Sequence, residues 1–157
     1  MKSSPSPAWW LETFLATARE LEADDGYTSR SPQLSAFKGT LWQFVEREVA
    51  SAHYRGLSVV DACDSWFSGA YLLETVPSVL YILMRYGDAP EQAIIRAVND
   101  TYDNDTIAAI VGAAVGALHG KAAPPRRWIE NLSGRTREDD DGKVFELLNA
   151  ARQRWWV

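Results

Sequence analysis

Three aspartates stand close together, directly before a long apolar segment. They are Asp100, Asp103 and Asp105, and Thr106 follows the last of them. Carboxylates cannot be buried as free anions, because removing even one of them from water costs several kcal/mol. The free backbone N–H groups at the start of the following helix can satisfy one carboxylate but hardly three. A hard divalent cation such as Mg²⁺ or Mn²⁺, which prefers oxygen ligands, can hold the others.

The spacing within Asp103-Asn104-Asp105-Thr106 favours a partial metal site. The two carboxylates flank a single residue, so both can point to the same side, and the threonine hydroxyl adds a neutral oxygen. Two carboxylates and one hydroxyl are too few for a closed coordination shell, so water, substrate or groups from elsewhere must complete it. An acidic loop that only caps the helix and faces solvent remains the alternative.

Other chemistries that use clustered acids fit this stretch less well. A calcium-binding EF-hand loop needs a glycine at its sixth position and a glutamate at its twelfth, and loops that begin at Asp100 or Asp103 lack both. Phosphatases that form an aspartyl phosphate place the aspartates after a buried strand, which residues 97–99 do not resemble. Terpene synthases are all-α and hold diphosphate through Mg²⁺, but the Arg or Lys that would help is missing near this cluster.

The apolar segment after the aspartates is predicted to be a helix over residues 105–119, closed by a glycine. Gly112 and Gly116 are four residues apart, and so are Ala113 and Ala117. Small residues at this spacing let neighbouring helices approach closely, so we expect this helix to pack tightly in the centre of a bundle. A metal site at its end would be held rigidly.

Helical spacing of apolar residues recurs along the rest of the chain. Pro77 must either kink the helix that contains it or move the start of that helix to about Thr75. No sustained two-residue alternation typical of strands occurs, so the predicted fold class is an all-α helical bundle. We expect one domain over residues 1–157, with residues 1–8 as a flexible leader. The predicted helices cover residues 10–21, 41–52, 59–66, 71–86, 91–98, 105–119, 124–132 and 145–156.

Helix caps account for two further polar features of the sequence. Ser58 is placed to cap the helix over residues 59–66, because its hydroxyl can accept a hydrogen bond from an otherwise unpaired backbone N–H group. The run Asp139, Asp140 and Asp141 precedes the last helix, where acids interact favourably with the helix dipole. We interpret that run as capping rather than as a metal site.

Charge and composition exclude several classes of function. The net charge is -5, and no basic stripe interleaved with aromatic residues occurs, so nucleic acid is an unsuitable partner. The longest apolar run is shorter than the roughly 20 residues that span a bilayer. Cys63 is the single cysteine, which rules out an internal disulfide and favours a reducing, cytoplasmic location. His53 and His119 lack ligand partners at helical spacing.

Residues 103–120 resemble the C-terminal signature of the ADP-ribosylglycohydrolase family, in which a D-x-D-T element opens a small-residue helix that ends in glycine. Residues 69–81 and 88–93 resemble the elements that precede this signature in the family, and they come in the same order. The similarity covers about residues 27–135. It implies an orthogonal all-α fold and a centre of two Mg²⁺ or Mn²⁺ ions. In such a centre the ions grip the ribose hydroxyls of an ADP-ribosyl group, while water displaces the linked group at the anomeric carbon.

The resemblance also assigns roles to residues of this chain. Asp103, Asp105 and Thr106 would be metal ligands. The Ser68-Gly69-Ala70 loop would lie against the ADP-ribose as the substrate-binding segment. Tyr71 and Glu74 are expected to be packing or supporting residues, because large residues at helical spacing are most often structural.

The sequence departs from the family pattern in two places. Thr101-Tyr102 stand where the family carries a pair of glycines. Nothing in residues 1–96 matches the family's N-terminal G-D motif, its T-D-D-T ligand set or the acidic residue that handles the water, so no catalytic residue is assigned. The chain therefore resembles the C-terminal half of the enzyme and carries one side of the metal site.

These observations lead to three functional hypotheses. The first is a hydrolase half that acts on an ADP-ribosylated protein or a small ADP-ribose derivative once an N-terminal chain or segment completes it. The second is an inactive binding or structural module on the same scaffold, and the third is a small all-α metal enzyme for a phosphorylated substrate. A half bundle exposes apolar helix faces, so we also expect the isolated chain to self-associate. The ADP-ribosyl linkage is not defined by this sequence.

Overall fold

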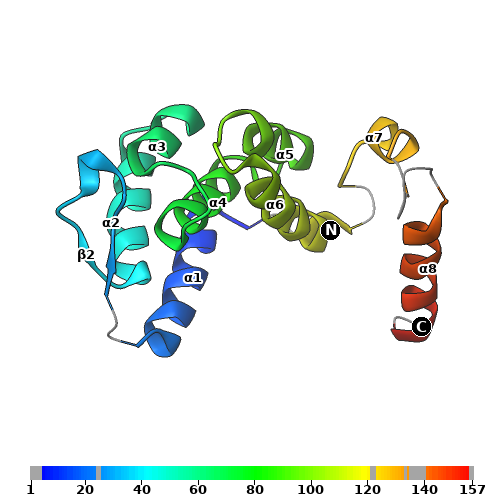
Figure 1. Cartoon of the computed structure of the whole chain (residues 1–157), viewed down its shortest axis with the longest axis horizontal. Coiled ribbons are helices and arrows are strands. Elements are labelled where there is room, and N and C mark those ends of the chain that lie inside the picture. The colour runs from blue at the N-terminus through cyan, green and yellow to red at the C-terminus, as the bar shows by residue number, and fades with distance from the viewer. Residues whose placement is uncertain (1–4, 24–25, 121–122, 133, 135–140, 156–157) are drawn as a thin grey trace. The chain divides into compact units, whose positions relative to one another are not determined.

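The computed structural model describes residues 5–23, 26–120, 123–132, 134 and 141–155. It divides into two compact units, Met1–Ala123 and Pro124–Val157. Helices dominate both units (Figure 1), which confirms the all-α prediction. No helix of the described residues is long and apolar enough to cross a membrane. The expectation of one domain for the whole chain stays a prediction.

The chain enters its first unit through α1, Pro7–Leu21. The Ser6 hydroxyl accepts a hydrogen bond from the backbone N–H of Trp9, and Pro7 occupies the first turn, where its missing N–H removes no helical hydrogen bond. The helix therefore begins inside the segment that we expected to be a flexible leader. Residues 1–4 lie outside the described part of the chain.

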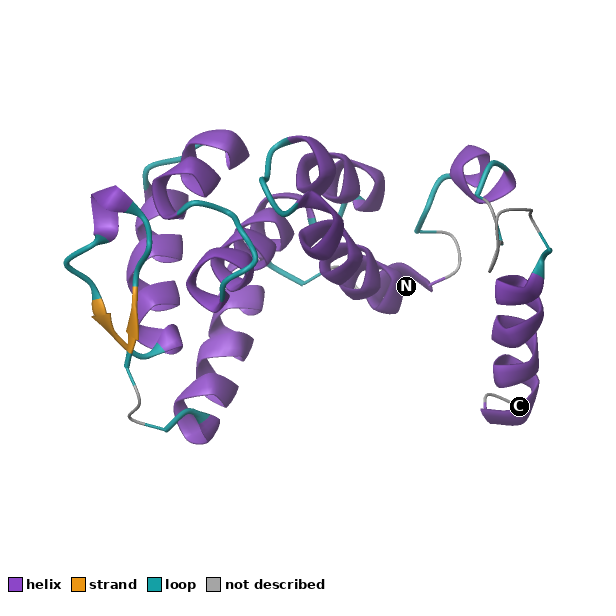
Figure 2. Cartoon of the chain, viewed as in Figure 1, coloured by secondary structure: helices purple, strands orange, loops and turns teal. Residues whose placement is uncertain are grey.

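A short hairpin follows where the sequence predicted only a loop. Strand β1, Tyr27–Thr28, pairs antiparallel with β2, Lys38–Gly39, and a 3₁₀ turn, Pro32–Leu34, lies between them (Figure 2). Two-residue strands are too short to show the alternation by which a strand is recognised in a sequence. They change the fold class little.

Helix α2 spans Leu41–Tyr54 and has a tightly defined start. The Thr40 hydroxyl and the Gln43 side chain form a reciprocal capping box. The Glu22 carboxylate, at the end of α1, accepts hydrogen bonds from the first two backbone N–H groups of α2, at 2.5 and 3.1 Å. An anion at a helix N-terminus is favoured by the helix dipole, so this contact ties α1 to α2.

Helices α3, Val59–Trp66, and α4, Leu72–Tyr86, form the centre of this unit. The predicted cap of α3 is confirmed, because the Ser58 hydroxyl accepts from the backbone N–H of Asp61 at 3.1 Å. Helix α4 begins at Leu72 and not at Thr75, so Pro77 lies inside it.

Helix α4 packs against α1, α2, α3, α5 and α6 (Figure 1). Its side chains are buried along most of its length. The largest buried side chains, Trp66 and Tyr81, meet edge to face with ring centroids 6.0 Å apart. Their polar atoms are satisfied: the Trp66 indole donates to Ser78 Oγ at 2.9 Å, and the Tyr81 hydroxyl donates to the Leu57 carbonyl at 2.6 Å.

Helices α5, Pro90–Asn99, and α6, Asn104–His119, form an adjacent pair. Helix α6 buries Ile107, Val111 and Val115, whose four-residue spacing defines one face. The prediction of close packing at the two glycines of α6 is wrong for the described residues. A Cβ added at Gly112 or Gly116 would meet no atom within 4 Å. The β-branched side chains form the packed face, with Ala108 and Ala114 partly buried against the core, and the two glycines lie outside it.

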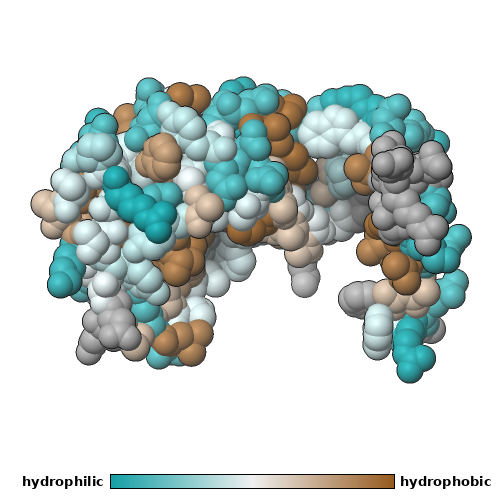
Figure 3. Space-filling model, viewed as in Figure 1, coloured by the Kyte–Doolittle hydropathy of each residue, from teal (hydrophilic) through white to brown (hydrophobic). Residues whose placement is uncertain are grey.

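The second unit contains α7, Arg126–Glu130, and α8, Lys143–Trp155. Neither helix has a buried residue, and Leu147 and Leu148 of α8 are exposed. Apolar side chains appear on the surface of each unit (Figure 3). Asp141 Oδ1 accepts from the backbone N–H at the start of α8 at 3.0 Å, as expected for a cap. Asp139 and Asp140 lie outside the described residues.

Candidate functional site

The carboxylate of Asp103 lies at the start of α6 without capping it. Asp103 occupies the cap position, and its carbonyl accepts the first helical hydrogen bond, from the Ile107 N–H at 3.0 Å. Its side chain makes no capping hydrogen bond, and Oδ2 is buried without a hydrogen-bond partner. A buried carboxylate oxygen in this state is unfavourable unless a cation or a donor reaches it. This atom is a negatively charged carboxylate oxygen, which is the kind of ligand that a hard divalent cation prefers.

The other two predicted ligands lie in the first turn of α6. Asp105 and Thr106 are exposed to solvent, and Asp105 Oδ1 accepts from the Thr106 backbone N–H at 2.9 Å. Within the described ranges, no group of three or more His, Cys, Asp or Glu side chains is arranged to hold a metal ion. These residues therefore provide at most part of a coordination shell.

The predicted substrate loop lies directly against the predicted metal loop. The Ser68 carbonyl accepts from the Asp103 N–H at 2.9 Å, and Ser68 Oγ accepts from the Tyr102 N–H at 3.1 Å. Ser68 and Tyr102 are 34 positions apart, yet one backbone–backbone hydrogen bond and one to the serine hydroxyl join the two segments. Ser68 and Gly69 are buried and Ala70 is exposed, so Ala70 supplies the loop's accessible surface and Ser68 positions the aspartate loop.

Gly69 is required by a close approach of Glu74 from the first turn of α4. A Cβ at Gly69 would lie 2.6 Å from Glu74 Oε2 and 3.2 Å from the Phe67 ring. The Glu74 side chain is almost fully buried, at 2% exposure, and its Oε1 has no hydrogen-bond partner. Burial raises the pKa of this carboxyl, while the positive charge of Arg30 and a backbone hydrogen bond at Tyr71 oppose that rise.

Sequence reasoning gave Glu74 and Tyr71 only a supporting role, and Arg30 none. Arg30 places its guanidinium 4.1 Å from the centre of the Tyr71 ring, next to the loop that Glu74 supports. A single acidic residue inside an otherwise apolar helix was the available signal. A carboxyl that keeps its proton more readily than usual, beneath a predicted substrate loop, is a candidate functional group.

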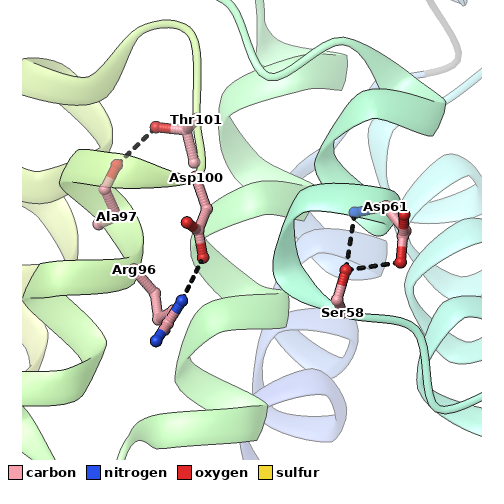
Figure 4. A network of polar contacts seen from close by, with 6 residues as sticks. All are labelled: Ser58, Asp61, Arg96, Ala97, Asp100 and Thr101. Atoms are coloured by element: carbon pink, nitrogen blue, oxygen red, sulfur yellow. Dashed lines mark hydrogen bonds and ion pairs between the residues drawn. The ribbon is translucent and has the colours of Figure 1, made fainter.

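The remaining aspartate, Asp100, ends α5 and belongs to a separate set of contacts. Its carboxylate pairs with Arg96 at 3.3 Å, and the Thr101 hydroxyl donates to the Ala97 carbonyl at 2.6 Å (Figure 4). A basic side chain therefore does lie beside the acidic cluster, one helical turn before it, where sequence reasoning found none.

A cavity of about 230 Å³ opens between α3 and the aspartate loop. The Ser58 cap and the Arg96–Asp100 pair lie on the two sides of this region (Figure 4). Cys63, buried near it, has a pKa raised to about 12 by burial, so its thiol is not reactive at neutral pH. The cavity is lined by Val60, Asp64, Asn99, Asp100, Thr101 and Tyr102.

Comparison with protein families gives a match over nearly the whole chain. The family model described as ADP-ribosylglycohydrolase matches residues 8–155. The chain belongs to the ADP-ribosylglycohydrolase family. The D-x-D-T element at the start of α6 and the Ser68 loop that touches it are thus parts of an ADP-ribosylglycohydrolase scaffold.

This ADP-ribosylglycohydrolase family chain is similar to an uncharacterised protein of Archaeoglobus fulgidus. The two are 41% identical over 76 residues. The matched segment is 48% of this chain and 24% of the archaeal protein. The chain thus matches about a quarter of the length of that relative. No solved structure matched significantly.

Proposed function

We propose that this chain forms one side of an ADP-ribosylglycohydrolase centre that binds Mg²⁺ or Mn²⁺ through Asp103, Asp105 and Thr106. The observation that carries the proposal is the buried, unpartnered Oδ2 of Asp103, held where the aspartate loop meets the Ser68 loop. Family membership supports hydrolysis as the reaction class. The wide exposure of Asp105 and Thr106 leaves their oxygens accessible to further ligands.

In this proposal the residues of this chain hold the metal ion and orient the substrate, and none of them attacks the anomeric carbon. Asp103 supplies a fixed carboxylate oxygen, and Ser68 fixes that loop through two hydrogen bonds, at 2.9 and 3.1 Å. A bound divalent ion would polarise and position the ribose hydroxyls. In the overall reaction, the bond from the anomeric carbon to the linked group breaks, a bond to the water oxygen forms, and one water proton passes to the leaving group.

The rest of the centre is proposed to come from groups outside this set. The described residues present no cluster of three metal-binding side chains, so further ligands must complete the shell. A complementing N-terminal segment, a separate chain, or a second copy of this chain would supply them. The proposed substrates are an ADP-ribosylated protein or a small ADP-ribose derivative, and the proposed location is the cytoplasm.

Calorimetric titration of Mn²⁺ and Mg²⁺ into the full chain tests the metal site. We expect Asp103→Asn and Asp105→Asn to weaken binding at least about tenfold, because each removes a charged oxygen ligand. Asp88→Asn is the matched control, since Asp88 is also an exposed carboxylate shortly before a helix, α5. Equal affinity in all four proteins would contradict the proposal.

An assay for released ADP-ribose then separates the hydrolase from an inactive binding module. The absence of a three-residue acidic cluster among the described residues favours the module for the chain by itself. Hydrolysis that appears only when an N-terminal family segment is added would support a divided enzyme. Metal and ADP-ribose binding without hydrolysis under either condition would support the module.

A further inference from the structure

Phe67 has an unusual backbone conformation directly beside the candidate site. It ends α3 with φ 60° and ψ 89°, and it is the one non-glycine residue with positive φ among the described residues. This conformation is unfavourable for a residue with a side chain, and a glycine would adopt it without strain. The Phe67 ring is nevertheless 47% exposed, so burial in the core does not account for the choice of residue. Strain of this kind is concentrated at functional positions.

A second exposed aromatic ring stacks on the first. Tyr102 is 63% exposed, its ring centroid lies 4.9 Å from that of Phe67, and the two planes differ by 27°. We call this pair the aromatic platform. Large apolar rings gain little from a position in water. Since about half of Phe67 and more than half of Tyr102 are exposed, the pair presents aromatic surface to a flat ligand.

The platform is fixed to the same hydrogen bonds that define the candidate site. The Tyr102 N–H donates to Ser68 Oγ, and the next residue, Asp103, donates to the Ser68 carbonyl. Phe67 directly precedes Ser68, and its carbonyl accepts from the Gly69 N–H at 2.7 Å. The two rings therefore border the proposed metal and substrate loops and are held by them.

The charge beside the platform limits which part of a ligand can lie there. Tyr102 also lines the cavity of about 230 Å³, and two acidic residues, Asp64 and Asp100, line it as well. Negative charge disfavours a diphosphate at this position. Arg96 pairs with Asp100 and offsets its charge, so a ligand in the cavity does not need to be a cation. Carboxylates accept hydrogen bonds, so the cavity suits a neutral group that donates them. An exocyclic amino group on an aromatic base has this chemistry.

We propose that Phe67 and Tyr102 stack the adenine base of an ADP-ribosyl group, with the amino edge of the base toward the carboxylate-lined cavity. This inference rests on the proposed function, since it names the platform as part of the same substrate site. Stacking of bases on aromatic side chains is a general mode of nucleotide recognition, because every base has a π face.

Binding of AMP to the full chain, compared with ribose 5-phosphate, which lacks the base, tests the platform. Tyr102→Ala is expected to weaken AMP binding roughly 5- to 150-fold, the range for loss of one base–aromatic stack. Tyr102→Phe retains the ring and should bind AMP as the unmodified chain does. Tyr54→Ala, which removes a 93% exposed tyrosine at the end of α2, is the matched control and should leave AMP binding unchanged.

Phe67→Gly is a second variant that removes a ring of the platform and is expected to keep the fold. Glycine adopts the φ of 60° freely, so this variant should unfold at a temperature no lower than the unmodified chain while it weakens AMP binding. The inference is overturned if AMP does not bind, if ribose 5-phosphate binds equally well, or if Phe67→Gly and Tyr102→Ala bind AMP normally.

The result is separable from the test of the metal site. If Mn²⁺ binding depends on Asp103 but AMP binding is indifferent to both rings, the platform inference fails and the proposed function stands. If AMP binding depends on the rings but no metal binds, the base site is supported and the proposed hydrolase centre is contradicted.

Discussion

Helices α4 and α6 are both strongly apolar, and the sequence predicted that α6 packs in the centre of a bundle. Helix α4 is buried along most of its length, whereas α6 buries Ile107, Val111 and Val115 and leaves Ile110 and Leu118 exposed at 44% and 38%. Helix α4 has five helical neighbours, while the main partners of α6 are α4 and α5. Apolar composition thus indicates that a helix can be covered, and the number of neighbours decides how much of it is.

Only one face of α6 contributes to the core of this unit. The other faces carry small and apolar residues that no described neighbour packs tightly, as the open space at Gly112 and Gly116 shows. Three sets of substitutions test this contrast between the two helices.

Isoleucine to alanine at three positions should give the largest effects. Ile82 of α4 and Ile107 of α6 are fully buried, so each substitution should lower the free energy of unfolding by about 2–5 kcal/mol through lost apolar contact and a cavity. Ile110 of α6 is 44% exposed, so the same substitution there should cost less than about 1 kcal/mol. Denaturant unfolding of the three variants measures these differences.

A large loss of unfolding free energy in Ile110→Ala would contradict this contrast between α4 and α6. That result would mean that the exposed face of α6 is covered in solution, and sedimentation of the unmodified chain would then show an assembly. Three equal losses would contradict the view that α6 has a single packed face.

Glu74 provides a test at the polar end of α4. Burial raises its pKa above the ordinary value of 4.5, so the folded state holds this proton more tightly than the unfolded state does. The resulting stability is fully present below pH 4.5 and is lost as the pH rises through the folded pKa. Glu74→Gln cannot titrate, so its unfolding free energy should fall less over that window than that of the unmodified chain.

Thermal or denaturant unfolding at a series of pH values measures this difference. Glu20→Gln, on the exposed surface of α1, is the control and should follow the unmodified chain. Parallel pH profiles for Glu74→Gln and the unmodified chain would show that the buried carboxyl does not keep its proton preferentially.

Glycine to alanine on α6 should give the smallest effect and one of opposite sign. With open space around both positions, Gly112→Ala and Gly116→Ala should each raise the free energy of unfolding by about 0.5–1 kcal/mol through helix propensity. Gly87→Ala should instead be destabilising, because its Cβ would lie 2.6 Å from the Leu83 carbonyl oxygen and 2.8 Å from Trp10 Nε1. A loss of stability at Gly112 would reveal a partner packed against α6.

Much of the candidate site was predictable because its signals are local. The D-x-D-T element at the start of α6 is defined by residue types at fixed spacing, and a helix start follows from the change from polar to apolar residues. The cap at Ser58 was predictable for the same reason. The roles of Asp103, Asp105 and Thr106 as ligands stay predictions.

Other features of the site depended on contacts between distant segments. The burial of Glu74 results from its approach to Gly69, and the stack of Phe67 on Tyr102 joins residues from the end of α3 and the loop before α6. The positive φ of Phe67 had no signal in the sequence, since phenylalanine is not a residue that favours this conformation.

The sequence by itself determined the all-α class, the positions of most helices and the family motif, because hydrophobic periodicity, caps and short motifs act over a few residues. The tertiary structure alone decided which apolar faces are covered, that the Ser68 loop lies against the aspartate loop, and that Asp103 and Glu74 each keep a buried oxygen without a partner. Burial and hydrogen bonding at these atoms depend on neighbours that are distant in the chain, and only the packing of α3, α4 and α6 brings them together.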